Sequence, residues 1–512
     1  MKNKNIQPIL YSLFIISGII IGNYINKPGS ESKTNNEKIH GILNLIQDHY
    51  VDTINSEDFN DKVINAILDE LDPHSDYINT EKFKGVEQDM QGSFSGIGVQ
   101  FNIIEDSIVV VAAISGGPSE KLGIQSGDRI VEVEGEDVAS INIKNEGVIK
   151  RLRGKNGTTV EIKILRRGSK NLLDFAIIRD EIPLYSVDAS IMLSTSIGYI
   201  KVNRFSATTF DEFNKGVKKL ISSGMKKLIL DLRGNPGGYL DMAISMCDAM
   251  LNEGNLIVYT QGRNRARENV YATKNGILQN TEIIVLIDEG SASASEIVSG
   301  ALQDNDRGLV IGRRSFGKGL VQEQIGLNDG SVVRLTTQRY YTPSGRCIQK
   351  KYGKNDKDYY TEPYLRNDEG VADTLMFTTK KGRTVYGGGG ITPDIILMRD
   401  STLNYLQINL MVSKGWVDEF CLKHSFAVKN TKIKDSKKLF IASENQEEIY
   451  ALFLDYVKQK DRSLKIKIGK VELDYFKNLL KATIARNLWD AEVYYEILND
   501  KDEFVQRALN SF

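Results

Sequence analysis

The sequence is poor in the residues from which disulfide frameworks and metal sites are built. Its 512 residues include four histidines and three cysteines, Cys247, Cys347 and Cys421. A disulfide framework needs paired cysteines and a metal site needs clustered donors, whereas these cysteines are odd in number and widely spaced. Four histidines leave little material for a histidine-based catalytic triad. We therefore expect no disulfide framework, no metal and no cofactor.

The sequence also lacks an excess of charge of either sign. Its 66 basic and 67 acidic residues nearly cancel. Since proteins that bind nucleic acid through bulk charge carry a basic excess, we expect no nucleic-acid partner. The hydrophobic share of 41% and the charged share of 26% are ordinary for a folded protein. A chain of this length exceeds what one hydrophobic core holds and predicts two to four domains.

A long hydrophobic run occurs near the N-terminus. Lys2 and Lys4 precede an apolar segment at 9–25, whose length is close to the ~20 residues of a membrane-spanning helix. We expect residues 1–26 to form an uncleaved signal anchor or transmembrane segment, followed by a polar tether at 27–37. A cleaved signal peptide and a buried core helix are the alternatives. Because positive flanks stay in the cytoplasm, the bulk of the chain is expected on the other side of the membrane.

The stretch 283–322 carries the residues with the clearest chemistry. An apolar run at 283–287 predicts a buried strand and 296–302 shows helical spacing, so the serines between them lie at a strand-to-helix turn. Unpaired backbone N–H groups at such a helix N-terminus can hold a developing negative charge. Lys318 follows in a glycine-flanked loop, which completes the parts of a Ser/Lys nucleophilic site. The candidate nucleophiles, which the residues alone do not distinguish, are Ser291, Ser293 and Ser295.

The segments SASASEIVSGALQD (291–304) and FGKGLVQ (316–322) resemble the signature of the carboxy-terminal processing peptidases, also called tail-specific proteases. The resemblance implies that Ser293 is the nucleophile, Lys318 the general base and Gln322 the residue that orients the lysine. A lysine acts as a base only when it is neutral. Its pKa must therefore fall by several units from ~10.4, which burial can achieve.

Glycine-rich segments at 91–101 and 115–133 resemble a PDZ domain, which we expect at 87–180. A PDZ domain captures an extended peptide by adding it to a sheet as a strand, and an amide-rich loop holds the terminal carboxylate. The alternative is that these glycines only form a tight turn or a bulge. The candidate peptide-binding residues are Gly96, Ile97, Gly98 and Val99.

Strands alternate with helices from residue 181 onward, which predicts an α/β core at 181–400. The family resemblance implies a crotonase-like (Clp-protease-like) α/β peptidase core within a multidomain α+β and α/β chain. The loop RGNPGG (233–238) follows a buried strand but lacks the Lys-Ser/Thr pair of a phosphate-binding loop. By resemblance, Gly238, or else Gly237, supplies one amide of an oxyanion hole and Ala294 supplies the other.

Helical spacing of apolar residues predicts helices at 39–50 and 59–71, inside an N-terminal helical region at 38–86. Residues 401–512 show similar spacing and lie beyond the family core, so we expect a helical C-terminal extension of unassigned role. N-terminal helices often contribute to dimers in the family, which makes a homo-oligomer through the N- or C-terminal helices an expectation. His74 lies in a segment that resembles the family, and we expect it to pack or to cap a turn rather than to catalyse.

These motifs together predict a serine endopeptidase that cleaves proteins near their C-termini, with substrate tails recognised by the PDZ domain. The expected partners are proteins or peptides with free C-termini and the membrane, and the expected location is the bacterial periplasm or cell envelope. The alternative is a catalytically inactive peptide-binding scaffold on the same fold. A crotonase-like enzyme that binds acyl chains or coenzyme A would explain the α/β core but not the PDZ domain.

Overall fold

The computed structural model describes residues 33–512 except 115, 167, 275, 354–355, 367–374, 399–404 and 430–435. The chain divides into two compact units, Met1–Leu71 and Asp72–Phe512. The predicted anchor at 1–26 lies outside the described residues. Among the helices that the structure describes, none is both long and apolar enough to cross a membrane.

Two helices form the described part of the first unit, α2 (Lys33–His49) and α3 (Ser56–Asp69). Both begin before the residue that apolar spacing alone indicates. The start of α3 is set by Asn55, whose side chain accepts two backbone N–H groups of the first turn at 3.1 and 3.4 Å. Exposed apolar side chains on these helices are Ile39, Ile42, Leu45 and Ile67.

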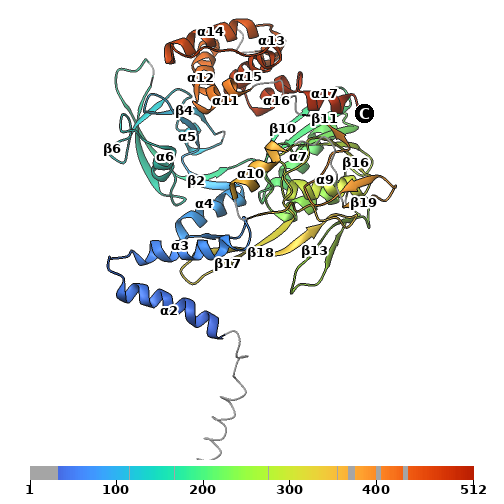
Figure 1. Ribbon diagram of the computed structural model, residues 1–512. Helices are drawn as coiled ribbons and strands as arrows, with labels where there is room; N and C mark the ends of the chain where they lie inside the picture. The colour runs from blue at the N-terminus through green and yellow to red at the C-terminus, as the bar shows by residue number, and fades with distance from the viewer. Residues whose placement is uncertain are drawn as a thin grey trace, which may run out of the picture. The chain divides into compact units, whose positions relative to one another are not determined.

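The second unit contains an antiparallel sheet that matches the expected PDZ domain (Figure 1). Its strands run in the order β3–β4–β5–β7–β8, with β6 paired to β5, so that β3 lies at an edge. The elements are β3 (Val99–Ile103), β4 (Ile108–Ala113), α5 (Pro118–Lys121), β5 (Arg129–Val133), β6 (Glu136–Asp137), α6 (Asn145–Leu152), β7 (Thr159–Leu165) and β8 (Leu173–Ile178). Before and after this sheet, β2 (Ser93–Gly96) pairs with β9 (Asp180–Pro183) and α4 spans Thr80–Gln91.

The central sheet of the second unit has the strand order β10–β11–β12–β15–β16–β21, and all neighbours except β10 and β11 are parallel. Alternate side chains of a strand point to opposite faces. Leu228 and Leu230 therefore join a core formed with three helices, whereas Ile229 faces α17. The strands are β10 (Val187–Met192), β11 (Ile197–Val202), β12 (Lys227–Asp231), β15 (Glu282–Ile287), β16 (Gly308–Gly312) and β21 (Ile395–Ile396); the helices are α7 (Thr209–Ser222), α8 (Leu240–Met250), α9 (Ala294–Asp304) and α17 (Glu503–Leu509). Parallel strands joined by helices confirm the predicted α/β core.

A second sheet in this unit carries the lysine loop. Its path is β1–β18–β13–β14, and β17 (Leu320–Gly326) pairs with β18 (Val332–Tyr341). Lys318 lies just before β17 and Gln322 lies within it, so the start of this strand sets the position of both residues. The remaining elements are β1 (Asp76–Ile78), β13 (Leu256–Gln261), β14 (Glu268–Tyr271), α10 (Asp356–Leu365), β19 (Met376–Thr378) and β20 (Thr384–Tyr386).

The C-terminal extension is helical, as the sequence predicts, and is drawn in orange to red in Figure 1. It has an apolar core of its own, in which Phe453 meets Phe420 and Phe476 edge to face with ring centroids 5.2 Å apart. Such pairs add to the stability that burial alone supplies. The helices before α17 are α11 (Leu406–Ser413), α12 (Trp416–Lys429), α13 (Lys437–Ala442), α14 (Gln446–Lys460), α15 (Lys470–Leu488) and α16 (Ala491–Asn499).

Candidate active site

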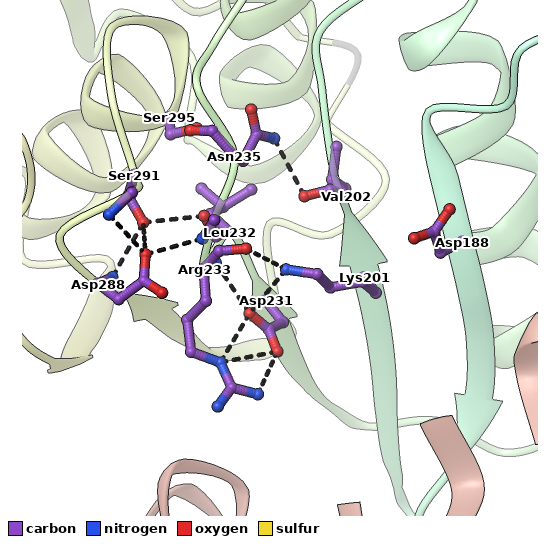
Figure 2. Close-up of polar contacts among 12 residues, drawn as sticks. Asp188, Lys201, Val202, Asp231, Leu232, Arg233, Asn235, Asp288, Ser291 and Ser295 are labelled. Carbon is purple, nitrogen blue, oxygen red and sulfur yellow. Dashed lines mark hydrogen bonds and ion pairs between the residues drawn. The ribbon is translucent and has the colours of Figure 1, made fainter. Parts of the chain in front are cut away.

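The three candidate serines have different surroundings. Ser291 Oγ donates a hydrogen bond to Leu232 O and Ser295 Oγ donates one to Asn235 O, both at 2.9 Å (Figure 2). Both serines are fully buried. Ser293 is half-buried, and within the described part of the chain its hydroxyl donates to no acceptor. Ser293 is therefore the serine whose hydroxyl is available for a reaction, a distinction that the sequence pattern alone could not make.

Ser293 has a backbone conformation that serine rarely adopts. It is the N-cap residue of α9, with φ 55° and ψ -112°. A positive φ in a residue with a Cβ is strained and persists only where surrounding interactions hold it. The Glu296 carboxylate supplies one such interaction, because its Oε2 accepts the Ser293 backbone N–H at 2.7 Å.

Glu296 joins the serine turn to the lysine loop. Besides the N–H of Ser293, its carboxylate accepts the Ser315 hydroxyl at 2.5 Å and the backbone N–H groups of Gly317 and Lys318 at 2.7 and 2.9 Å. The side chain is fully buried. Burial raises the pKa of Glu296, and these hydrogen bonds oppose the rise. We did not assign Glu296 from the sequence, although a glutamate three residues after an N-cap serine is the pattern of a capping box.

Lys318 has the surroundings that a neutral lysine requires. Its Nζ donates to Gln322 Oε1 at 2.9 Å. Burial, helped by the charge of Arg334, lowers the pKa of Lys318 from 10.5 to about 8, while nearby carboxylates oppose the shift. The orientation of the Gln322 amide is fixed by a second hydrogen bond, in which its Nε2 donates to the backbone carbonyl of His74. The structure thus brings Lys318 and Gln322 together, and it adds the carbonyl of His74 to the network.

Tyr340 contacts the backbone of both the serine turn and the lysine loop. Its hydroxyl lies 3.1 Å from Ser293 O and 2.5 Å from Lys318 O. The side chain is buried, at 1% exposure. No hydrogen bond joins Ser293 Oγ to Lys318 Nζ in the described chain. The backbones of the two residues are instead linked through their common hydrogen-bond partners, Glu296 and Tyr340.

The glycine loop after β12 packs directly on the serine turn. A Cβ on Gly237 would lie 2.8 Å from Ser293 Cβ and 3.0 Å from Ala294 N. A Cβ on Gly238, whose φ is 147°, would lie 2.0 Å from Phe205 O. Neither position can carry a side chain without a shift of the backbone.

The two glycines of this loop differ in the use of their amides. Gly237 donates its N–H to Asn235 Oδ1 at 2.9 Å. The N–H of Gly238 has no acceptor among the described residues, and the same is true of Ala294 at the first position of α9. Gly238 and Ala294 therefore retain the free donors that an oxyanion hole needs, whereas Gly237 does not.

The four candidate peptide-binding residues form the end of β2, the loop after it and the start of β3. Gly96, Ile97 and Gly98 are buried, and Val99 is half-buried. Gly98 has φ 73°, a conformation that favours glycine. Its carbonyl accepts the N–H of Ile114 at 2.9 Å, so the loop is held against the rest of the PDZ sheet.

No group of three or more His, Cys, Asp or Glu side chains in the described part of the chain is arranged to hold a metal ion.

Sequence reasoning did not identify Glu296, Tyr340 or the carbonyl of His74 as parts of this site. Tyr340 and His74 lie on other elements than the serine and lysine motifs, so no local pattern marks them.

Comparison with known proteins identifies the family. The profile of Peptidase family S41 matches residues 196–359 and that of the PDZ domain matches residues 95–177. The carboxy-terminal-processing protease of Bartonella bacilliformis is 37% identical over 350 residues, which cover 66% of this chain and 80% of the relative. The carboxy-terminal processing protease CtpA of Bacillus subtilis is 35% identical over 349 residues, which cover 67% of this chain and 74% of the relative. A solved structure of the photosystem II D1 C-terminal processing protease is 26% identical with a TM-score of 0.37, covering 69% of this chain and 85% of that chain. The extent of these sequence matches shows that the chain belongs to the carboxy-terminal processing proteases of peptidase family S41, which are serine proteases that carry a PDZ domain.

Proposed function

We propose that this protease cleaves proteins near their C-termini with Ser293 as nucleophile, Lys318 as general base and Gln322 as the residue that orients the lysine. The observation that carries the assignment is the environment of Lys318. Its pKa lies near 8 and its Nζ is held by an uncharged amide oxygen at 2.9 Å. A carboxylate in place of Gln322 would stabilise the ammonium form and weaken the base.

The reaction begins with neutral Lys318. Its Nζ takes the proton of the Ser293 hydroxyl while Oγ attacks the carbonyl carbon of the scissile peptide bond. The negative charge that develops on the carbonyl oxygen is held by the N–H groups of Gly238 and Ala294. Lys318 then gives its proton to the leaving amine, which departs as the C–N bond breaks. In the second half, Lys318 activates a water molecule that hydrolyses the ester of Ser293.

The first proton transfer needs Ser293 Oγ and Lys318 Nζ within hydrogen-bonding reach. In this structure Lys318 Nζ bonds Gln322 instead. Catalytic hydrogen bonds are often long in free enzymes and tighten when substrate binds. A rearrangement that brings Ser293 Oγ within reach of Lys318 Nζ on substrate binding is therefore part of the proposal.

Substrate tails are captured by the PDZ domain in this proposal. β3 lies at the edge of its sheet, where an extended peptide can add as a further strand. The residues proposed to receive the terminal carboxylate and the first peptide residues are Gly96, Ile97, Gly98 and Val99. The substrate class is thus a protein or peptide with a free, unstructured C-terminus.

The location and assembly of the protease are also proposals. The apolar run at 9–25 behind two lysines supports a membrane anchor, with the bulk of the chain in the bacterial periplasm or cell envelope. The exposed apolar side chains of α2 and α3, among them Ile42 and Leu45, support a homo-oligomer formed through these helices.

The proposed dyad is tested by cleavage of an unstructured protein with an apolar C-terminal tail. We expect Ser293→Ala and Lys318→Ala each to lower kcat by at least about 10³-fold, since loss of a nucleophile or its base removes most of the rate enhancement. Lys226→Ala, at an exposed lysine, is the matched control and should retain full activity. A serine-directed fluorophosphonate should label the control but not Ser293→Ala. Unimpaired turnover by either dyad variant would refute the assignment.

A further inference from the structure

A cluster of charges lies at the start of the glycine loop, and no step of the mechanism uses it. Its central carboxylate, Asp231, is 1% exposed, whereas the side chains of Arg233 and Asp502 are 17% and 25% exposed. Asp231, at the end of β12, accepts hydrogen bonds from Tyr199 Oη at 2.8 Å and from Lys201 Nζ at 3.3 Å. The guanidinium of Arg233 donates to both oxygens of the same carboxylate (Figure 2). A buried charge network of this kind is stable only when every member is paired.

The C-terminal extension supplies one member of this cluster. Arg233 Nη1 lies 2.9 and 2.8 Å from the two carboxylate oxygens of Asp502, immediately before α17. The Phe504 ring of α17 lies 4.7 Å from the guanidinium carbon. With carboxylates on two sides and an aromatic ring against it, the guanidinium of Arg233 has a single well-defined position.

α17 is itself firmly attached to the central sheet. Phe504, Val505 and Ala508 are buried in the core that covers one face of this sheet. Asp502 caps the helix, because its Oδ1 accepts the backbone N–H groups of Phe504 and Val505 at 3.0 Å. The Asp502 carboxylate, which pairs with Arg233, is thus held in place by the N-terminus of α17.

Arg233 begins the turn that ends at Gly238. Its backbone N–H donates to Asp231 Oδ1 at 2.9 Å, and its carbonyl accepts Lys201 Nζ. Two residues later, Asn235 accepts the N–H of Gly237. Except at Pro236, each residue of the turn from Arg233 to Gly237 is therefore held by a hydrogen bond, and the turn ends at the free amide of Gly238.

We infer that Asp502 is a positioning residue for the oxyanion hole and acts through Arg233. This inference rests on the proposed function, in which the Gly238 amide stabilises the oxyanion. Stabilisation by such a donor requires its N–H within hydrogen-bonding distance of the oxygen, so a small displacement of the turn lowers the rate. The extension beyond residue 400 thereby contributes to the reaction without contacting substrate.

The variant Asp502→Asn separates the ion pair from the helix cap. Asparagine caps helices as well as aspartate does, so α17 should form, but the negative charge opposite Arg233 is lost. Asp490→Asn is the matched control. Asp490 caps α16 through the N–H of Val493 at 3.0 Å and forms no ion pair with any residue that the structure describes.

We expect Asp502→Asn to lower kcat, per site titrated with fluorophosphonate, by about tenfold, less than the ~10²–10³-fold typical of deleting an oxyanion donor. KM should change by less than about twofold, because Asp502 lies outside the PDZ domain that is proposed to capture the substrate tail. Asp490→Asn should match the wild type, and Asp502→Glu should recover part of the rate. A kcat for Asp502→Asn within about twofold of the control would overturn the inference.

Hydrogen exchange supplies a second readout. Peptides that span residues 232–239 should exchange faster in Asp502→Asn than in Asp490→Asn, because the turn has lost one of its anchors. Unchanged exchange there would contradict the inference even if kcat fell. The two proposals fail in different ways: an active Ser293→Ala variant refutes the dyad, whereas an inactive Ser293→Ala beside a fully active Asp502→Asn refutes only the role of Asp502.

Discussion

Lys318 owes its lowered pKa to burial and to the charges that face it. Burial and Arg334 disfavour its ammonium form, whereas Glu296 and Asp72 favour it. His74 lies close enough to interact with the lysine, but burial lowers the pKa of His74 to about 4, so its ring is neutral at any pH near 7. Lys318, with its pKa of about 8, therefore changes its charge between pH 7 and 9, whereas His74 stays neutral over that range.

This environment predicts the pH dependence of the protease. Only the neutral form of Lys318 can accept the serine proton, and that form increases as the pH rises through the pKa of about 8. We expect kcat/KM to rise by about tenfold per pH unit below that value and to level off above it. The measurement is a pH profile of kcat/KM between about pH 6 and 10 on a substrate without titratable groups near the cleavage site. A profile that is flat across pH 8 would show that Lys318 is not the base.

At the scale of the element, α12 packs against the PDZ sheet. Leu422 of α12 is 2% exposed and is buried with Ile104 and Val109. These three residues form the small apolar cluster through which the extension contacts the PDZ domain.

We expect Leu422→Ala to lower the free energy of unfolding by about 2 kcal/mol, the low end for a buried leucine, because this cluster is small. Leu439→Ala on α13 is the matched control, since Leu439 is 64% exposed and should contribute little. The measurement is the midpoint of urea unfolding for the two variants and the wild type. Equal midpoints for both variants would show that the cluster does not stabilise the fold.

At the scale of the whole molecule, the proposed membrane attachment through the N-terminal segment can be tested directly. The proposed anchor at 1–26 predicts that the full-length protein partitions with membranes and resists extraction by high salt or alkaline carbonate. Removal of residues 1–26 should release it, since the apolar residues of the segment 9–25 account for most of the binding free energy. A full-length protein found entirely in the soluble fraction would refute the anchor. Extraction of the full-length protein by salt alone would indicate peripheral attachment instead.

The domain boundaries of the sequence analysis, including 87–180 and 181–400, remain predictions of where one part of the chain ends and the next begins. The successful predictions concern secondary-structure elements that short stretches of sequence specify. The strand at 283–287, the helix after Ser295 and the helical extension each follow from a hydrophobic period that the chain carries in consecutive residues.

The sequence by itself determined the family and the α/β core, because short motifs and hydrophobic periods carry both in consecutive residues. The catalytic roles of Ser293, Lys318 and Gln322, which the resemblance implies, remain a proposal. The tertiary structure gave the physical difference between Ser293 and its two neighbours and between Gly238 and Gly237, since burial and hydrogen bonding decide which hydroxyl and which amide stay free. It alone brought Asp502 to Arg233, which are 269 residues apart. A contact of that range leaves no local pattern, because it exists only after the sheet and α17 have packed together.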